Sequence, residues 1–144
     1  MGAINNSNVL ITTLKNFPTK GGDVLQAMKI SDPGFCGFGE AYFSWVFKDE
    51  IKAWKRHKRM TLNLVVPFGN VKFVFCLPKL KNIDFYVVNA GMNDLIRLTV
   101  PPGIWFGFQG LNDDKSLVLN IASITHDPDE VERKPADDFD FNWR

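Results

Sequence analysis

The stretch Lys52-Ala-Trp-Lys-Arg-His-Lys-Arg59 runs through Met60 into the apolar segment Thr61-Leu-Asn-Leu-Val-Val-Pro-Phe-Gly69. In an extended chain successive side chains point to opposite faces, so we expect Lys55, His57 and Arg59 on one face and Lys52 on the other. The apolar run that follows indicates that this basic strand enters a folded core. Basic groups carried into a core require a partner or a function, which makes this stretch the leading candidate for a site.

The rest of the chain consists of short apolar runs separated by Gly, Pro and Asn-Asp breaks. No run has a convincing helical period, and no segment repeats another. About ten short strands at regular spacing are typical of an all-β sandwich or barrel. The expected strands are residues 9–14, 24–30, 40–47, 51–59, 61–66, 71–77, 83–89, 95–100, 104–109 and 116–122.

Length and composition limit the possible classes of protein. The 144 residues fit one domain, 1–144, and the net charge of +1 gives no overall attraction to nucleic acid or an anionic membrane. No apolar run approaches the ~18 residues that span a bilayer, and residues 1–6 lack a basic region followed by a hydrophobic one. Two cysteines, Cys36 and Cys76, are expected as free thiols in a reducing compartment, so we expect a cytoplasmic protein.

Aromatic residues are abundant for a domain of this size. The chain has thirteen Phe and four Trp residues, which one small domain cannot easily bury, so we expect a homodimer with residues 24–30 or 35–47 at the interface. The acidic C-terminal stretch 125–144 ends on Phe139, Phe141 and Trp143. A disordered acidic tail would lack such aromatic residues, so we expect this stretch to lie against the barrel.

Two motifs resemble the signatures of cupin barrels. Val100-Pro-Pro-Gly-Ile-Trp-Phe-Gly-Phe108 resembles the second signature, with Phe106 in place of its histidine. The first signature is similar to Lys55-Arg-His57 with Leu62 and Gly69, where His57 keeps the family identity. The strand Glu40-Ala-Tyr-Phe-Ser44 and the closing run from Asp127-Pro128 and Glu130 to Trp143 resemble the dTDP-4-dehydrorhamnose 3,5-epimerase branch.

This resemblance implies an all-β double-stranded β-helix, or jelly-roll, barrel that is usually dimeric and holds a nucleotide-linked sugar in a polar interior. The implied activity is 3- or 3,5-epimerisation of a dTDP- or CDP-linked 4-keto-6-deoxyhexose in the synthesis of O-antigen or another surface polysaccharide. A sugar-nucleotide 3,4-ketoisomerase and an inactive sugar- or nucleotide-binding cupin are the alternatives. Because His57 alone survives among the four ligand positions of the family, we expect no metal and no cofactor.

The chain departs from the family at its catalytic positions. Lys55 occupies the position of the catalytic base, no tyrosine follows Tyr86 to serve as the acid, and the chain ends before the aspartate that orients the histidine. His57, Lys55 and His126 are therefore the candidates for proton transfer, with a hydrogen-bonded barrel histidine or a surface residue as the alternative for each. The candidates for binding the sugar or nucleotide are Lys52, Arg59, Tyr42, Asn63, Trp105 and Asn120.

Overall fold

The fold was analysed in a computed structural model, which describes residues 9–79 and 81–144; the N-terminal residues 1–6 lie outside this range. The described part contains strands, one turn of 3₁₀ helix and no helix long and apolar enough to cross a membrane. The elements are β1 (Leu10–Thr13), β2 (Asn16–Phe17), β3 (Val24–Leu25), β4 (Glu40–Phe47), β5 (Ile51–His57), β6 (Leu62–Phe68), β7 (Asn70–Pro78), β8 (Ile83–Gly91), β9 (Ile96–Val100), β10 (Trp105–Gly110), β11 (Lys115–Ala122), η1 (Pro128–Glu130) and β12 (Val131–Arg133).

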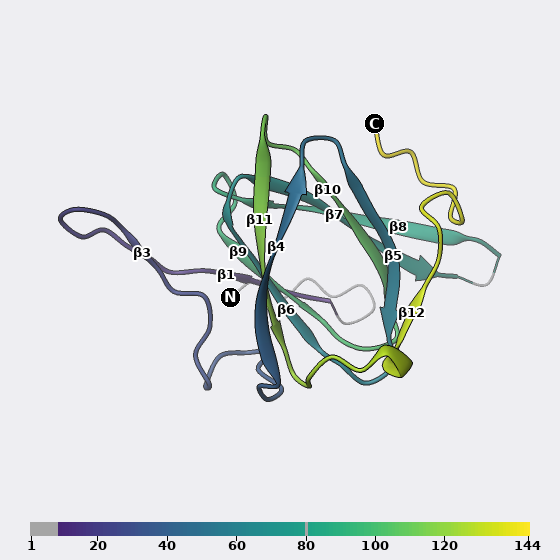
Figure 1. The fold of residues 1–144 in the computed structure, drawn as a ribbon, viewed down its shortest axis with the longest axis horizontal. Helices are drawn as coiled ribbons and strands as arrows, with labels where there is room; N and C mark the ends of the chain where they lie inside the picture. The colour runs from purple at the N-terminus through teal and green to yellow at the C-terminus, as the bar shows by residue number, and fades with distance from the viewer. Residues whose placement is uncertain (1–8, 80) are drawn as a thin grey trace.

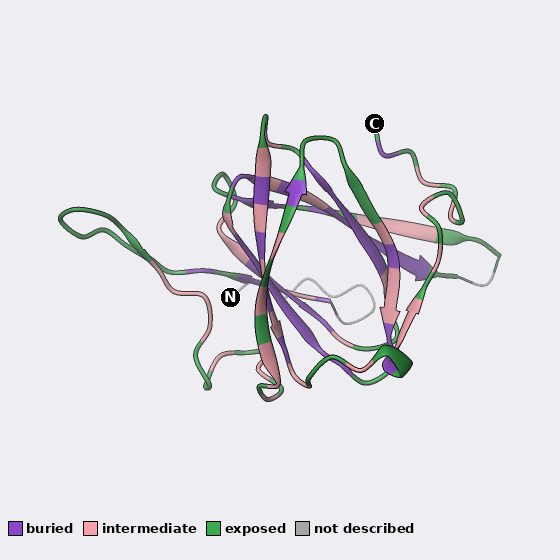
Figure 2. Ribbon diagram, viewed as in Figure 1, coloured by how far each residue is buried: buried purple, intermediate pink, exposed green. Residues whose placement is uncertain are grey.

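The larger strands form two antiparallel sheets of five strands each. The first sheet has the order β1-β9-β6-β11-β4 and the second has the order β12-β5-β10-β7-β8. They enclose one interior (Figure 1), so the predicted jelly-roll barrel is confirmed. The short strands β2 and β3 form a separate arm that extends away from the barrel and is exposed along most of its length (Figures 1 and 2).

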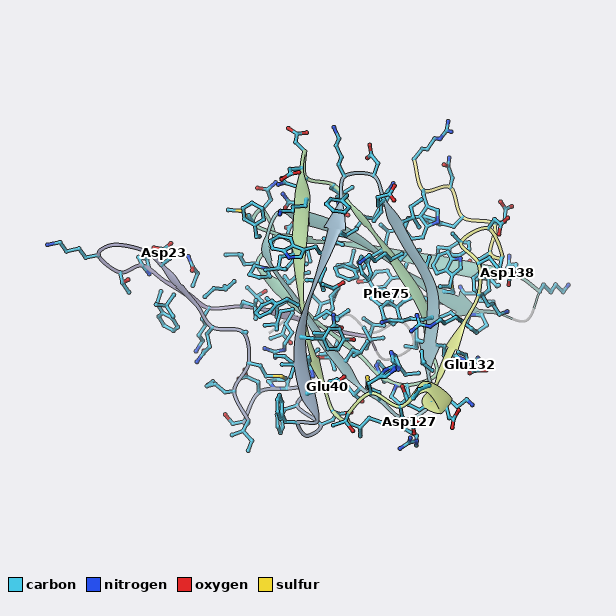
Figure 3. The ribbon with its side chains drawn as sticks, in the orientation of Figure 1. Asp23, Glu40, Phe75, Asp127, Glu132 and Asp138 are labelled. Carbon is cyan, nitrogen blue, oxygen red and sulfur yellow. The ribbon has the colours of Figure 1, made fainter. Side chains whose placement is uncertain are left out.

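A large cluster of buried apolar side chains packs inside the barrel. On β6 the alternate residues Leu62 and Leu64 face this core, because a strand with one buried face alternates inward and outward side chains. Phe75, labelled in Figure 3, lies fully buried inside the barrel and stacks on Phe106 of the neighbouring strand with ring centroids 6.0 Å apart. Phe108 extends the same layer. Phe106 and Phe108, the inward residues of β10, are thus part of the apolar core of the barrel.

A loop after β3 covers the outer face of the first sheet. The expected strand over residues 24–30 ends at Leu25, because Lys29 donates its backbone N–H to the carboxylate of Asp32 and the chain turns. Arg97, which is 1% exposed, holds this loop by donating to the carbonyl oxygens of Ala27 and Pro33 at 2.9 and 3.0 Å. The loop therefore occupies the outer side of the sheet and leaves the barrel interior free.

The C-terminal segment packs on the outer face of the second sheet, as the sequence predicts. The rings of Phe139, Phe141 and Trp143 lie 5.3, 6.5 and 5.2 Å from the ring of Trp54. The indole nitrogen of Trp54 donates to the carbonyl oxygen of Ala136 at 3.0 Å. This aromatic cluster fixes β5 from outside, so the inward side chains of β5 have a rigid support.

Candidate functional site

An irregularity in β5 places two lysines on the same wall of the barrel. Lys55 pairs with Phe106 on β10, whereas Lys52 pairs with Phe108. A step of three residues along β5 therefore matches a step of two residues along β10. Such a β-bulge reverses the side-chain alternation. The expectation that Lys52 and Lys55 lie on opposite faces is therefore wrong, and both face the interior beside two core phenylalanines.

These lysines line a cavity of about 350 Å³ between the two sheets. On the opposite wall, Tyr42 of β4 and Asn120 of β11 are cross-strand neighbours and point inward. Lys52 reaches across and donates to Ser44 Oγ at 3.2 Å and to the carbonyl oxygen of Trp45 at 2.7 Å. The lining residues are Tyr42, Ser44, Ile51, Lys52, Ala53, Trp54, Lys55, Phe108, Asn120, Arg133 and Lys134.

A buried histidine and a buried carboxylate lie just beyond Lys55. His57 is the next residue on the inward face of β5, about 7 Å farther along the strand. Its Nδ1 bonds to Glu130 Oε1, and the two side chains are 8% and 2% exposed. The other oxygen of Glu130 accepts the backbone N–H groups of Arg59 and Met60, both at 3.0 Å. Glu130 thus holds His57 in place and is itself held by the turn after β5.

Charge and burial set the protonation of this pair. Burial lowers the pKa of His57, while the hydrogen bond that His57 donates to Glu130 opposes that shift without cancelling it. Burial alone would raise the pKa of Glu130, but its hydrogen bonds to His57 and to two backbone N–H groups bring it below the ordinary value. We therefore assign an ionised Glu130 and a neutral His57 with its proton on Nδ1. Nε2 of His57 then carries a lone pair, and it is buried without a partner among the described residues.

The two walls differ in their proton chemistry. Burial lowers the pKa of Lys55 to about 8, and the positive charges of Arg133 and Lys52 act in the same direction. Burial raises the pKa of Tyr42, and the nearby Glu40 raises it further. At neutral pH the neutral His57 can therefore accept a proton and most Lys55 side chains still carry one, while the β4 wall presents a protonated phenol that can donate one.

The other residues singled out in the sequence do not line this cavity. Arg59 is paired with Asp127 at 3.0 Å, and His126 lies in the exposed segment before η1. Asn63 points to the outer side of the first sheet, where it donates to the carbonyl oxygen of Gly34 at 3.0 Å and accepts from Thr99. Trp105 lies on the outer face of the second sheet. Four of the nine predicted site residues, Lys52, Lys55, Tyr42 and Asn120, thus share the cavity wall, and His57 lies next to it.

The fold and the sequence both match a crystallised sugar-nucleotide enzyme. A dTDP sugar isomerase from Desulfovibrio desulfuricans G20 is 34% identical, with a TM-score of 0.89 over 95% of this chain and 91% of that one. The chain belongs to the cupin family of dTDP-sugar isomerases and epimerases.

Two further similarities fall within the same family. The sequence is 28% identical over 106 residues to the probable low-salt glycan biosynthesis epimerase Agl13 of Haloferax volcanii, a match that spans 67% of this chain and 66% of that protein. The fold is similar to that of QdtA, a sugar 3,4-ketoisomerase from Thermoanaerobacterium thermosaccharolyticum crystallised with TDP, at 20% identity and a TM-score of 0.74 over 89% of each chain. No family model matches the sequence.

Two residues of this site, Glu130 and Arg133, were not among the candidates predicted from the sequence. Glu130 stands among many acidic residues of the C-terminal stretch, and Arg133 follows it at the end of β12 beside β5. The carboxylate beside His57 is thus Glu130, which lies at an earlier point in the chain than the family resemblance led us to expect. The sequence offers one indication of their position. Val131-Glu-Arg133 alternates as a short strand would, and this strand directly follows Glu130.

The site has few donors for a metal. Within residues 9–79 and 81–144 no three His, Cys, Asp or Glu side chains gather closely enough to hold an ion. Leu62 and Phe106, at two ligand positions of cupins, are buried in the apolar core. Nδ1 of His57 is engaged by Glu130, so this histidine offers one nitrogen at most. Because so few side chains here could bind a metal, we continue to predict that the chemistry of this site does not use one.

Proposed function

We propose that this protein isomerises a dTDP-linked 4-keto-6-deoxy sugar by moving a proton at the carbon next to the ketone, most directly as a 3-epimerase or 3,5-epimerase. The buried His57–Glu130 pair beside the lysine-lined cavity carries this proposal. A carboxylate on Nδ1 fixes the imidazole and stabilises its protonated form, so Nε2 can accept a proton. The similarity to the dTDP sugar isomerase gives the class of substrate.

Epimerisation needs proton-transfer groups on opposite sides of the sugar ring. In our proposal His57 removes the proton from the β5 side, and Tyr42 returns one from the β4 side. Lys55 lies beside the position where the ketone oxygen gains negative charge. The tyrosine acid of this proposal comes from β4, whereas the family resemblance led us to expect it near or after β11.

A 3,4-ketoisomerase is the second candidate. Lys55 and His57 lie on one wall, and a single base on one side of the ring can carry a proton between two adjacent carbons. The similarity to the QdtA fold is compatible with this reaction. The two reactions give different products from the same 4-keto sugar.

The first test is therefore to identify the product. Incubation of the protein with dTDP-4-keto-6-deoxyglucose, followed by NMR, is expected to show inversion at C3, alone or together with C5. A product with its ketone at C3 and a hydroxyl at C4 would assign the ketoisomerase instead. If neither product accumulates above the enzyme-free control, with CDP-linked sugar tried as well, the protein is a binding cupin.

The nucleotide fits the cationic mouth of the cavity. Arg133 of β12 and Lys52 of β5 both line this cavity, whereas the ammonium of Lys134 pairs with Asp138 and lies over the rings of Trp105 and Phe139. Clustered cations suit a diphosphate, so we place the diphosphate here and the sugar beside Tyr42 and Lys55. Cys36 and Cys76 are both free, which fits a reducing compartment, and we propose a cytoplasmic role in the synthesis of a surface polysaccharide.

We also propose that the protein is a homodimer through the outer face of β4. Phe43, Trp45 and Phe47 alternate on this face and are 64%, 46% and 61% exposed, and Phe68 of β6 adds to the same apolar surface. β4 is also an edge strand of its sheet, a position at which a further strand can pair. A second copy of the chain would cover both features.

Light scattering at micromolar concentration is expected to give twice the chain mass of 16.4 kDa. Phe43→Glu should shift the protein towards the monomer, because a charge in an apolar interface costs free energy. Ile83→Glu on β8, far from this face in the sheet order, serves as the control and should remain dimeric. A monomer mass for the unmodified protein would contradict the proposal.

A further inference from the structure

The side chain of Lys55 lies in the cavity wall without a bonding partner. Its Nζ donates no hydrogen bond and forms no ion pair within the described part of the chain, and it lies 5.8 Å from the ring centroid of Phe106. Lys52, by contrast, is bonded to β4. The amine of Lys55 is therefore available to a molecule in the cavity.

The surroundings of Lys55 disfavour its protonated form. Burial is the main cause, and Arg133 and Lys52 add like charges, while Glu130 opposes them. With a pKa of about 8, roughly one tenth of the side chains carry a neutral amine at pH 7 and about half at pH 8. Lysines that attack carbonyl groups are typically activated in this way, by desolvation or by a neighbouring cation.

We propose that Lys55 forms an imine with the ketone carbon of the sugar and that isomerisation proceeds through this covalent intermediate. The inference rests on the proposed function, because it requires a keto sugar in the cavity. A hexose ring is small enough for a volume of about 350 Å³. A protonated imine withdraws electrons from the neighbouring carbon more strongly than a ketone does, so the adjacent C–H becomes more acidic.

Each step balances without an added oxidant or reductant. The neutral amine of Lys55 attacks the ketone carbon, and the ketone oxygen leaves as water after it has gained one proton from the amine and one from an acid. The resulting iminium keeps one N–H. His57 removes the proton from the adjacent carbon, and that electron pair forms an enamine. Return of a proton to carbon, from Tyr42 for inversion, regenerates the iminium, and water releases the product and the amine.

The position of His57 supports this sequence of steps. It follows Lys55 on the same inward face, and the positive charge of Lys55 contributes to the lowered pKa of His57. Its Nε2 can take the carbon-bound proton, while Glu130 stabilises the imidazolium that results. The alternative is that Lys55 stays protonated and stabilises an enolate by its charge alone, which forms no covalent bond.

Reductive trapping separates these two roles. The protein is incubated with dTDP-4-keto-6-deoxyglucose and sodium cyanoborohydride, and its intact mass is measured. We expect a mass increase equal to the substrate less one oxygen atom, located on Lys55 by peptide mapping. Lys55→Arg and Lys55→Met should lose the adduct. Lys79→Met, an exposed lysine after β7 that pairs with Asp84 and does not line the cavity, should keep an adduct on Lys55, and dTDP, which has no ketone, should give none.

A second measurement on the unmodified protein does not depend on any variant. Because imine formation exchanges the ketone oxygen with water, the protein should accelerate the entry of ¹⁸O from labelled water at C4 above the rate of spontaneous hydration. Deuterium exchange at C3 is followed in the same samples. Exchange of deuterium without an adduct and without faster ¹⁸O entry overturns the imine and leaves the proposed isomerase standing. Absence of deuterium exchange overturns the proposed function itself.

Discussion

Replacement of His57 by asparagine is expected to lower the rate of isomerisation by about 10²- to 10⁴-fold, which is the range for loss of a general base. Asparagine keeps a polar group near Glu130 but cannot accept and release a proton near neutral pH. The rate constant for turnover should fall much more than the affinity for dTDP, because the nucleotide is proposed to bind at the mouth of the cavity. Initial rates and equilibrium dTDP binding measure the two effects separately.

Arg56→Gln is the matched control for this change. Arg56 precedes His57 on β5 but faces outward, where it bonds to Glu132 at 2.8 Å and lies 4.8 Å from the ring of Trp105. Its removal should leave the rate within about twofold, since an exposed ion pair contributes little free energy. Full activity in His57→Asn, with folding confirmed by thermal melting, would show that another group is the base.

Glu130→Gln is expected to destabilise the fold by about 2–4 kcal/mol and to lower the rate about 10- to 100-fold. The carboxylate accepts one bond from His57 and two backbone N–H groups. The amide of glutamine has the same size but replaces one carboxylate oxygen with an NH₂ group. That group faces either His57 or the two backbone N–H groups, so at least one buried donor loses its acceptor. His57 also loses the charge that stabilises its protonated form.

Glu132→Gln, two residues farther on, is the control. Its side chain is 38% exposed and pairs with Arg56, so the loss should be below about 1 kcal/mol. Urea unfolding gives the free energy of unfolding for both variants. Equal losses in Glu130→Gln and Glu132→Gln would contradict the structural role assigned to Glu130.

The protonation of His57 and Glu130 also predicts how the free energy of unfolding depends on pH. Both pKa values are lowered in the folded state, so both groups contribute stability that is present at high pH and lost on acidification. The loss should begin as pH falls below the ordinary value of 6.5 for His57 and continue below that of 4.5 for Glu130. In Glu130→Gln the second part of this loss should be smaller.

The fold class was predictable because short apolar runs with a two-residue period determine strands almost by themselves. The apolar alternation of β6 and the breaks at Gly and Pro identify the barrel, and the aromatic residues of the tail show that it packs on the protein. The strand expected after Val24 was wrong beyond Leu25, because the backbone there bonds to the side chain of Asp32. A local hydrogen bond of this kind competes with a sheet and leaves no periodic signal.

The site was only partly predictable, for two physical reasons. The β-bulge that turns Lys52 inward depends on the register between β5 and β10, which cannot be read from β5 alone. Glu130 reaches His57 from 73 positions away, so no local pattern distinguishes it from the exposed acids around it. Asn63 lies within an apolar run as an interior residue would, yet its partners are Gly34 of the loop that covers the first sheet and Thr99 of the neighbouring strand β9.

The central claim is that this protein takes a proton from the carbon next to the ketone of a sugar nucleotide, and deuterium incorporation tests it most directly. The protein is incubated in heavy water with dTDP-4-keto-6-deoxyglucose, and the sugar is analysed by mass spectrometry and NMR at early times. The account predicts deuterium at C3 at a rate proportional to protein concentration and abolished in His57→Asn. A rate no greater than that of the enzyme-free control, with both dTDP- and CDP-linked substrates, would contradict it.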